Sequence, residues 1–566
     1  MAKKKMNGWL SSENRTAVIK RFALYTLFFI IAAFQGYRLG TGDLDTYLPF
    51  VYHEFDDSLF KGDLLMETVG VHPVYIWKAM GALLHLLPGE TLFLVAFFIQ
   101  IMVIMTGLVL FYREFFGFDK GVYLLLAMMS ISKSSAAMGR YGLNPYKYFQ
   151  PGAMAFGVFL MTVVLWNRKR WIAGGCLCGL MFLFHPFTAV TLGLTYAVLV
   201  VLQWKSVHIK NILMGGVAMV VVASPAILPY LHHLVEKNST VFDFSLWLEI
   251  VQRRMAHSFF ISQWVSDRFV HLIAALAVIV SFRRHQAFMN VLPVVIAPVI
   301  SVLMMAAGEM VSSKMLLQLQ LGRTTYLVFV IMIMFIANRV VRIRFSSISV
   351  QDAIWFAVAL FITVYPLVEK NIKSTVPIIL TVLLILIPAA LFFSARMKKP
   401  VLSKWIGFLD GNVLITVFLF FSVTATAFML QKRYSQTGVL FDLTASDYTE
   451  IAAWVRNNIP SEEMIMTPIY LEGFRGHSSH PIYGTWKDGA PHNYCEATVF
   501  RWWERMQKFG IEISTDKSNF PRLYHEKALE IARTEAIKYV VFENEKFNAA
   551  LPVLFKNKTY AIARID

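Results

Sequence analysis

The acidic residues of one short segment are the side chains in this sequence best suited to chemistry. Residues 39–72 contain Asp43 and Asp45, two positions apart, and Glu54 follows them. One carboxylate could accept a proton from an attacking hydroxyl group, and two could hold a divalent metal ion. Acids two positions apart face opposite ways in an extended chain, so they converge only where the chain turns. The alternative is a solvated acidic loop that only fixes the topology.

Basic residues that could bind an anion lie in two later segments. Segment 231–268 contains Arg253, Arg254 and His257, and segment 308–323 contains Lys314 and Arg323. Such cations could hold a phosphate or a lipid headgroup. The alternative for the first set is an amphipathic helix that faces lipid headgroups. The alternative for Arg323 is a side chain that extends toward water from a helix end.

A third candidate segment is polar and aromatic. Residues 139–151 include Tyr141, and aromatic faces beside hydrogen-bonding groups suit sugar rings. They equally suit the aromatic belt of a membrane protein. The sequence has no phosphate-binding loop, zinc-binding spacing or nucleophilic-serine motif, and its three cysteines have no metal-binding spacing.

The composition indicates which elements position these residues. The chain has 566 residues, of which 57% are hydrophobic and only 16% are charged, below the roughly 25% of globular proteins. Apolar blocks alternate with short Lys/Arg clusters, which is typical of a polytopic membrane protein. The net charge of +17 is spread among these clusters rather than on one basic face, so nucleic acid is not a predicted partner.

A transmembrane helix needs about 20 mostly apolar residues, and this length predicts about thirteen spans. The predicted spans are 20–38, 91–112, 120–137, 150–167, 170–185, 187–204, 211–230, 269–283, 288–307, 323–339, 351–367, 375–394 and 410–430. The fifth and sixth are divided at Pro186, because proline ends or kinks a helix. The apolar stretch 73–88 is predicted to lie in the membrane interface.

Charge sets the predicted orientation. With Lys3, Lys4 and Lys5 in the cytoplasm, the inner loops are short and basic, and most acids and histidines lie outside. Segments 39–72 and 231–268 are then long outer loops. An odd number of spans places the C-terminus on the outer side.

The C-terminal part of the chain, 431–566, is predicted to be a small extracytoplasmic α/β domain that follows a membrane module, 1–430. Helices are predicted over 447–458, 501–509 and 526–533, and strands over 464–467, 537–542 and 560–564. A polar loop, 473–493, separates the first strand from the second helix.

A first helix followed by a long acidic outer loop, here Asp43-Leu44-Asp45-Thr46-Tyr47, resembles the C-type membrane glycosyltransferases. That superfamily includes protein O-mannosyltransferases, oligosaccharyltransferases and lipid A aminoarabinose transferases. The layout of about thirteen spans with an external C-terminal domain is also similar. The chain lacks the Asp-Glu pair of protein mannosyltransferases. Its Trp502-Trp503-Glu504 is only superficially like the WWD-type motif of oligosaccharyltransferases, so no subfamily is identified.

The resemblance implies an enzyme that acts on the outer face of the membrane, and the compact loops favour the bacterial inner membrane. It would transfer a hexose or pentose from a polyprenyl-phosphate carrier to a glycan, lipid or protein acceptor. Asp43 or Asp45 would be the base or would bind a divalent metal ion. The candidates for substrate and carrier phosphate are Arg253, Arg254, His257, Lys314, Arg323, Tyr141 and Glu54.

Two other functions stay open. A flippase or transporter of a lipid-linked envelope precursor would show inverted repeats and polar residues at mid-membrane, and His185 is the nearest candidate for such a residue. A non-catalytic scaffold would tolerate changes to the loop acids. The C-terminal domain would either recognise the acceptor or cap the catalytic cavity, and the sequence does not decide between these roles.

Overall fold

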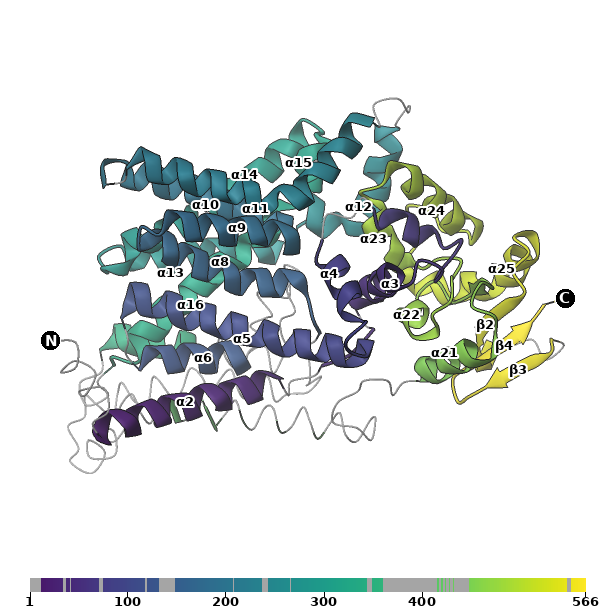
Figure 1. Ribbon diagram of the computed structural model, residues 1–566, viewed down its shortest axis with the longest axis horizontal. Helices are drawn as coiled ribbons and strands as arrows, with labels where there is room; N and C mark the ends of the chain where they lie inside the picture. The colour runs from purple at the N-terminus through teal and green to yellow at the C-terminus, as the bar shows by residue number, and fades with distance from the viewer. Residues whose placement is uncertain are drawn as a thin grey trace.

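The computed structural model describes residues 12–33, 37–40, 42–70, 75–117, 120–131, 148–206, 208–236, 243–264, 266–343, 349–359, 447–546 and 551–565, and a few isolated residues between 415 and 431. Most of the described residues are helical, and a four-stranded sheet lies near the C-terminus (Figure 1). A bundle of roughly parallel helices fills one side of the view in Figure 1, and the C-terminal region fills the other.

The helices before residue 341 are α2 (Ser12–Ala33), α3 (Leu44–Phe55), α4 (Ile76–Leu83), α5 (Gly89–Phe116), α6 (Gly121–Ile131), α8 (Pro151–Asn167), α9 (Trp171–Phe184), α10 (Pro186–Gln203), α11 (Ile209–Glu236), α12 (Phe244–Phe259), α13 (Ser266–Ser281), α14 (Ala287–Met310), α15 (Lys314–Gln318) and α16 (Tyr326–Val340). Two short 3-10 turns also shape the outer loops, η2 (Leu64–Thr68) and η4 (Leu321–Thr325).

Five stretches of the described chain are long and apolar enough to cross a membrane. They are Gly89–Phe116, Pro186–Gln203, Ile209–Leu228, Ala287–Met310 and Lys314–Val340. Each predicted span from the first through 323–339 coincides with a helix, several of them shorter than a full span. The predicted span 375–394 and most of 410–430 lie outside the described residues, so the count of thirteen stays a prediction.

The predicted break before Pro186 is confirmed. Helix α9 ends at Phe184 and α10 begins at Pro186. The ring of His185 accepts a hydrogen bond from the backbone N–H of Thr188 and so caps α10. A proline at the first helical position suits this start, because its missing N–H would have no partner in the helix.

Glycines let the bundle helices approach closely. A Cβ atom on Gly107 of α5 would lie 2.5 Å from the carbonyl oxygen of Gly157 in α8, and one on Gly175 of α9 would lie 2.1 Å from that of Gly215 in α11. Small residues allow this packing between membrane helices. The outer face of α11 is apolar and exposed, for example at Val217 and Val221, as expected of a surface that faces lipid.

The C-terminal region contains a mixed sheet with the strand order β1-β2-β4-β3. Its strands are β1 (Ile465–Met466), β2 (Tyr539–Glu543), β3 (Val553–Lys556) and β4 (Tyr560–Arg564), and its longer helices are α21 (Asp447–Asn458), α24 (Glu496–Lys508) and α25 (Phe520–Thr534). The predicted helix 447–458 and strand 560–564 are confirmed with the same bounds. The analysis of the sequence did not predict β3, an edge strand whose Val553 and Leu554 are exposed.

Segments 39–72 and 231–268 share an apolar core with the C-terminal region. Trp247, Ile250 and Phe259 of α12 are buried in the same apolar cluster as Trp502 and the other core residues of the C-terminal helices. In Figure 1, α3 and α4 lie between the bundle and the C-terminal region. This arrangement brings three distant parts of the sequence to one place.

Candidate functional site

A pocket lies where segment 39–72, the bundle and the C-terminal region meet. Its lining residues come from all three parts: Asp43, Thr46, Tyr47, Gln150, Pro151, Gly152, His185, Phe187, Thr188, Met255, Gln320, Arg323, Thr324, Tyr326, Lys487, Ala490, Pro491 and Tyr494. The cavity has a volume of about 90 Å³.

Asp43 is the acidic residue among those that line the pocket. It immediately precedes α3, and its Oδ2 accepts a hydrogen bond of 2.8 Å from the side-chain amide of Gln150. Its Oδ1 lies 3.5 Å from Nζ of Lys487. Burial alone would raise the pKa of Asp43. Lys487 and Arg323, together with the hydrogen bond from Gln150, outweigh burial and hold that pKa below its ordinary value. Asp43 is therefore an ionised carboxylate at neutral pH.

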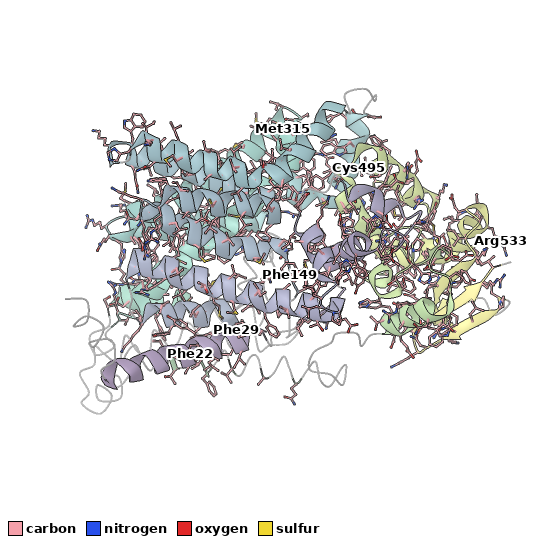
Figure 2. All side chains as sticks on the ribbon, in the orientation of Figure 1. Phe22, Phe29, Phe149, Met315, Cys495 and Arg533 are labelled. Carbon is pink, nitrogen blue, oxygen red and sulfur yellow. The ribbon has the colours of Figure 1, made fainter. Side chains whose placement is uncertain are left out.

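A buried side chain on α5 positions Gln150. The Oε1 of Gln100 accepts the backbone N–H of Gln150 at 2.7 Å, and its Nε2 donates to the carbonyl of Tyr148 at 3.2 Å. Both backbone contacts fix the chain just before α8, whose first residue is Pro151. Phe149 lies at the end of the bundle that faces the C-terminal region (Figure 2). The amide of Gln150 is thereby directed at Asp43.

Arg323 is held from the opposite side by α12. Its Nη2 donates to the hydroxyl of Ser258 at 2.9 Å, and Ser258 is buried. Arg323 lies in η4, which follows Gln320, a residue in the left-handed conformation with φ 47°. Such a conformation is costly for a residue with a side chain. Gln320 is buried and lines the pocket, and its Oε1 has no hydrogen-bond partner among the described residues.

Lys487 enters the pocket from the C-terminal region, in the short 3-10 turn η6 (Trp486–Asp488). Arg254 of α12 fixes this turn, because its Nε donates to the carbonyl of Trp486 at 2.7 Å and its Nη2 to that of Lys487 at 3.1 Å. Burial is the main reason that the pKa of Arg254 is lowered, to about 10. Arg254 thus positions Lys487 and does not itself line the pocket.

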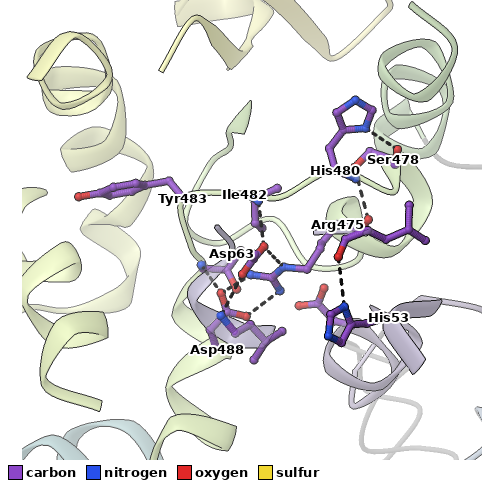
Figure 3. A network of polar contacts seen from close by, with 12 residues as sticks. His53, Asp63, Arg475, Ser478, His480, Ile482, Tyr483 and Asp488 are labelled. Carbon is purple, nitrogen blue, oxygen red and sulfur yellow. Dashed lines mark hydrogen bonds and ion pairs between the residues drawn. The ribbon is translucent and has the colours of Figure 1, made fainter. Parts of the chain in front are cut away.

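A buried ion triad anchors the same turn to segment 39–72 (Figure 3). Both Nη atoms of Arg475 donate to the carboxylate of Asp488, at 3.0 and 2.7 Å, and its Nε donates to Asp63 at 2.6 Å. All three residues are almost fully buried. Asp63 also accepts the backbone N–H of Leu65 and of Ile482. Each charge is thus paired and hydrogen-bonded, as a buried charge requires.

Asp45, the other candidate base, lies outside the pocket lining. It is buried, and its Oδ1 accepts the backbone N–H of Gly473 at 2.7 Å, whereas its Oδ2 has no hydrogen-bond partner in the part of the chain that the structure describes. Burial and the nearby Asp488 raise the pKa of Asp45 to about 7. The structure places Asp45 at a contact between α3 and the C-terminal region.

The remaining predicted site residues are dispersed. Arg253 lies 5.7 Å from the ring of Trp486, Lys314 lies 5.8 Å from the ring of Trp247, and Glu54 packs beside Gly81 of α4. None of the three lines the pocket. The side chain of His257 and the whole of Tyr141 lie outside the described residues.

Lys487 and Tyr494 line the pocket but were not among the predicted site residues. Gln150 and Gln320 also line it and lie in the candidate segments 139–151 and 308–323, and His185 stands at the predicted helix break. Nothing in the local sequence distinguishes Lys487 from other surface lysines. No group of three or more His, Cys, Asp or Glu that could hold a metal ion is present in the described part of the chain.

Comparisons with known proteins identify similarities at two levels. A family described as a domain of unknown function, DUF6798, matches residues 446–509, the segment that includes Lys487 and Tyr494. Among proteins with curated descriptions, none matches this chain.

Two solved structures are similar to this chain over almost its whole length. One is ArnT from Cupriavidus metallidurans bound to undecaprenyl phosphate, with 11% identity, a TM-score of 0.47 and coverage of 97% of this chain and 98% of that one. The other is the same protein in the apo state, with 11% identity, a TM-score of 0.48 and coverage of 98% of both chains. At this level of similarity the comparison does not indicate what this chain binds.

Proposed function

We propose that this protein is a membrane glycosyltransferase that takes a sugar from a polyprenyl-phosphate donor and transfers it to an acceptor on the outer face of the membrane. The observation that supports it best is the grouping of one ionised carboxylate, Asp43, with two cations, Arg323 and Lys487, in a pocket at the end of an apolar helix bundle. The acidic first outer loop and its resemblance to C-type glycosyltransferases point to the same reaction.

The chemistry requires opposite charges at the two ends of the reacting centre. The hydroxyl oxygen of the acceptor attacks the anomeric carbon and gives its proton to Asp43. The bond between the anomeric carbon and the phosphate oxygen breaks, and its electron pair leaves with the phosphate. Arg323 and Lys487 bind that phosphate and stabilise the charge that develops on it. The apolar helices provide the surface along which a prenyl chain would lie.

Binding of the donor would also change the pKa of Asp43, the proposed base. Lys487 and Arg323 lower the pKa of Asp43, and a carboxylate with a low pKa is a weak base. A bound phosphate would attract the same two cations and weaken their effect on Asp43. Asp43 would therefore become a better proton acceptor only when the donor is present, which would limit unproductive reaction with water.

We propose that residues 487–494, which form one wall of the pocket, close the site over the bound donor. This segment contributes Lys487, Ala490, Pro491 and Tyr494 to the pocket. It would shield the bound donor from water and place Lys487 on its phosphate. The family match over 446–509 covers this wall.

The test is a transfer assay on the purified full chain in nanodiscs, with radiolabelled polyprenyl-phosphate sugars and a crude envelope fraction as acceptor. We expect release of the free carrier phosphate that depends on Asp43 and on Arg323. Lys508→Gln is a matched control, because Lys508 pairs with Glu535 on the exposed surface of α24. Movement of the lipid across the bilayer without release of carrier phosphate would contradict the proposal and favour a flippase.

A further inference from the structure

A second group of cations lies on the outer side of the turn that carries Lys487. Arg253, Arg254 and Lys517 surround the ring of Trp486, with distances of 5.7, 5.8 and 5.7 Å to its centroid. Arg253 and Arg254 belong to α12, whereas Lys517 begins the 3-10 turn η7 (Lys517–Asn519) of the C-terminal region. None of Arg253, Arg254 and Lys517 lines the pocket, so this cluster is a separate feature.

Several N–H groups of this cluster have no hydrogen-bond acceptor among the described residues. The guanidinium of Arg254 donates to the backbone carbonyls of Trp486 and Lys487. In the part of the chain that the structure describes, Nε and Nη2 of Arg253 and Nε1 of Trp486 are buried without an acceptor. Buried polar groups in native proteins nearly always have a partner, and a missing one calls for an explanation. The absent partner must be an acceptor, because all three atoms carry N–H groups.

The electrostatics of the cluster also favour an anion. The pKa of Lys517 is lowered by partial burial and by the neighbouring charges of Arg254 and Arg253, so these like charges repel one another. Glu472 and Asp516 lie close enough to act on them, but among the described residues neither forms an ion pair with the three cations. The carboxylate of Asp516 instead accepts the backbone N–H of Ser518.

We propose that Arg253, Lys517 and Trp486 form a second anion site, which binds a phosphate group of the acceptor. The assignment to the acceptor depends on the proposed function, whereas the binding of phosphate does not. A phosphate suits this site because the arginine fork, the ammonium group and the indole N–H offer more donors than the two oxygens of a carboxylate would use. Lys517 is exposed and Arg253 is partly exposed, so the ligand arrives from the outer surface.

The position of the cluster relates it to the transfer reaction. Trp486 and Lys487 are adjacent, and Trp486 forms part of the cluster while Lys487 lines the pocket. Arg254 holds both residues by their carbonyls. A phosphate on the acceptor would therefore be bound beside the pocket in which the donor phosphate lies, and would direct the acceptor hydroxyl toward Asp43.

The binding test uses inorganic pyrophosphate as the probe and isothermal titration of the full chain in phosphatidylcholine nanodiscs. We expect two binding events. Arg323→Gln should remove the binding event at the pocket. Arg253→Gln and Lys517→Gln should each lower the affinity of the second binding event by about tenfold. Lys517 is exposed, so Lys517→Gln leaves the fold intact, and Lys508→Gln is the matched surface control. If Arg253→Gln and Lys517→Gln both bind pyrophosphate as the wild type does, the proposed second site is disproved.

Two further measurements are needed. One distinguishes a lipid headgroup from a water-soluble phosphate as the ligand, and the other tests the anion site independently of the proposed function. In nanodiscs that contain phosphatidic acid, a lipid-headgroup ligand would occupy the site and abolish its pyrophosphate event, whereas a water-soluble ligand would leave the event unchanged; both results support the site. An event that depends on Lys517, in a protein that transfers no sugar from any carrier, would disprove the proposed function and retain the anion site.

Discussion

Nζ of Lys487 lies 3.5 Å from Oδ1 of Asp43, although 444 positions separate the two residues in the chain. The contact joins the C-terminal region to segment 39–72 inside the pocket. It also depends on neighbours at some distance, since Arg254 fixes the backbone of the turn and the Asp63–Arg475–Asp488 triad anchors it. The pocket is therefore complete only when the C-terminal region is docked on the bundle.

The first prediction separates the two candidate bases. Asp43→Asn should lower the transfer rate by about 10²–10⁴-fold, the usual contribution of a general base. Asp45→Asn should retain transfer, because asparagine can still accept the backbone N–H of Gly473. Initial rates of carrier-phosphate release would measure both effects. Equal loss of rate in the two variants, with unchanged thermal unfolding, would contradict the assignment.

The second prediction concerns the pH dependence of transfer. Lys487 lowers the pKa of Asp43, so Lys487→Met should raise that pKa. Asp43 would then be protonated at a higher pH, and the acidic limb of the kcat/KM profile should move to higher pH. Profiles of the wild type, Lys487→Met and the control Lys508→Met would test this. A shift of the limb to lower pH would show that Lys487 does not act on the base.

The third prediction concerns the buried triad. Arg475→Met leaves Asp63 and Asp488 buried without their cation, so the docked C-terminal region should lose about 3–5 kcal/mol of stability. Arg501→Gln is the control, because the pair of Arg501 with Glu67 is half exposed and contributes about 0–1 kcal/mol. Unfolding curves in detergent would show the difference. Equal curves for the two variants would mean that the triad does not anchor the region.

The fourth prediction follows from Asp45. Its folded-state pKa of about 7 is above the ordinary value of 3.8, so the folded state keeps the proton over a range in which the unfolded chain releases it. The stability of the packing that buries Asp45 beside Gly473 should therefore fall as the pH rises from about 4 to 7, and should level off above that.

Hydrogen exchange of the segment that contains Gly473, corrected for the intrinsic effect of pH, would measure this loss. Asp45→Asn cannot titrate and should show constant protection. The same pH dependence in Asp45→Asn would assign the effect to another group.

The fifth prediction concerns Gln320, whose side chain donates to the hydroxyl of Tyr494 and leaves Oε1 without a partner at the pocket. Gln320→Gly should fold at least as well, because glycine accepts the left-handed conformation without strain, yet its KM for the donor should rise. Gln320→Ala keeps the strain and also lacks the amide. Equal KM values in both variants would assign the effect to the amide, whereas a defect in Gln320→Ala alone would assign it to the backbone.

The sequence alone determined the elements. Apolar runs of membrane-spanning length, the proline at 186 and the amphipathic pattern of 447–458 predict helices that the structure contains, because length, proline geometry and periodicity are local properties. The short exposed strand β3 carries no such pattern, and the analysis of the sequence missed it. The acidic loop was also recognisable from the sequence, because carboxylates near a membrane are energetically costly and therefore uncommon.

Only the tertiary structure decided which of these residues meet. Asp43 and Asp45 are alike in the sequence, but Asp43 precedes α3 and lines the pocket, whereas the side chain of Asp45 is buried against Gly473. Lys487 had no distinguishing local signal, because its role arises from a contact with Asp43 over 444 positions. Side-chain convergence of this kind depends on how the helices and the C-terminal region pack. No local pattern encodes that packing, and so the site follows from the fold.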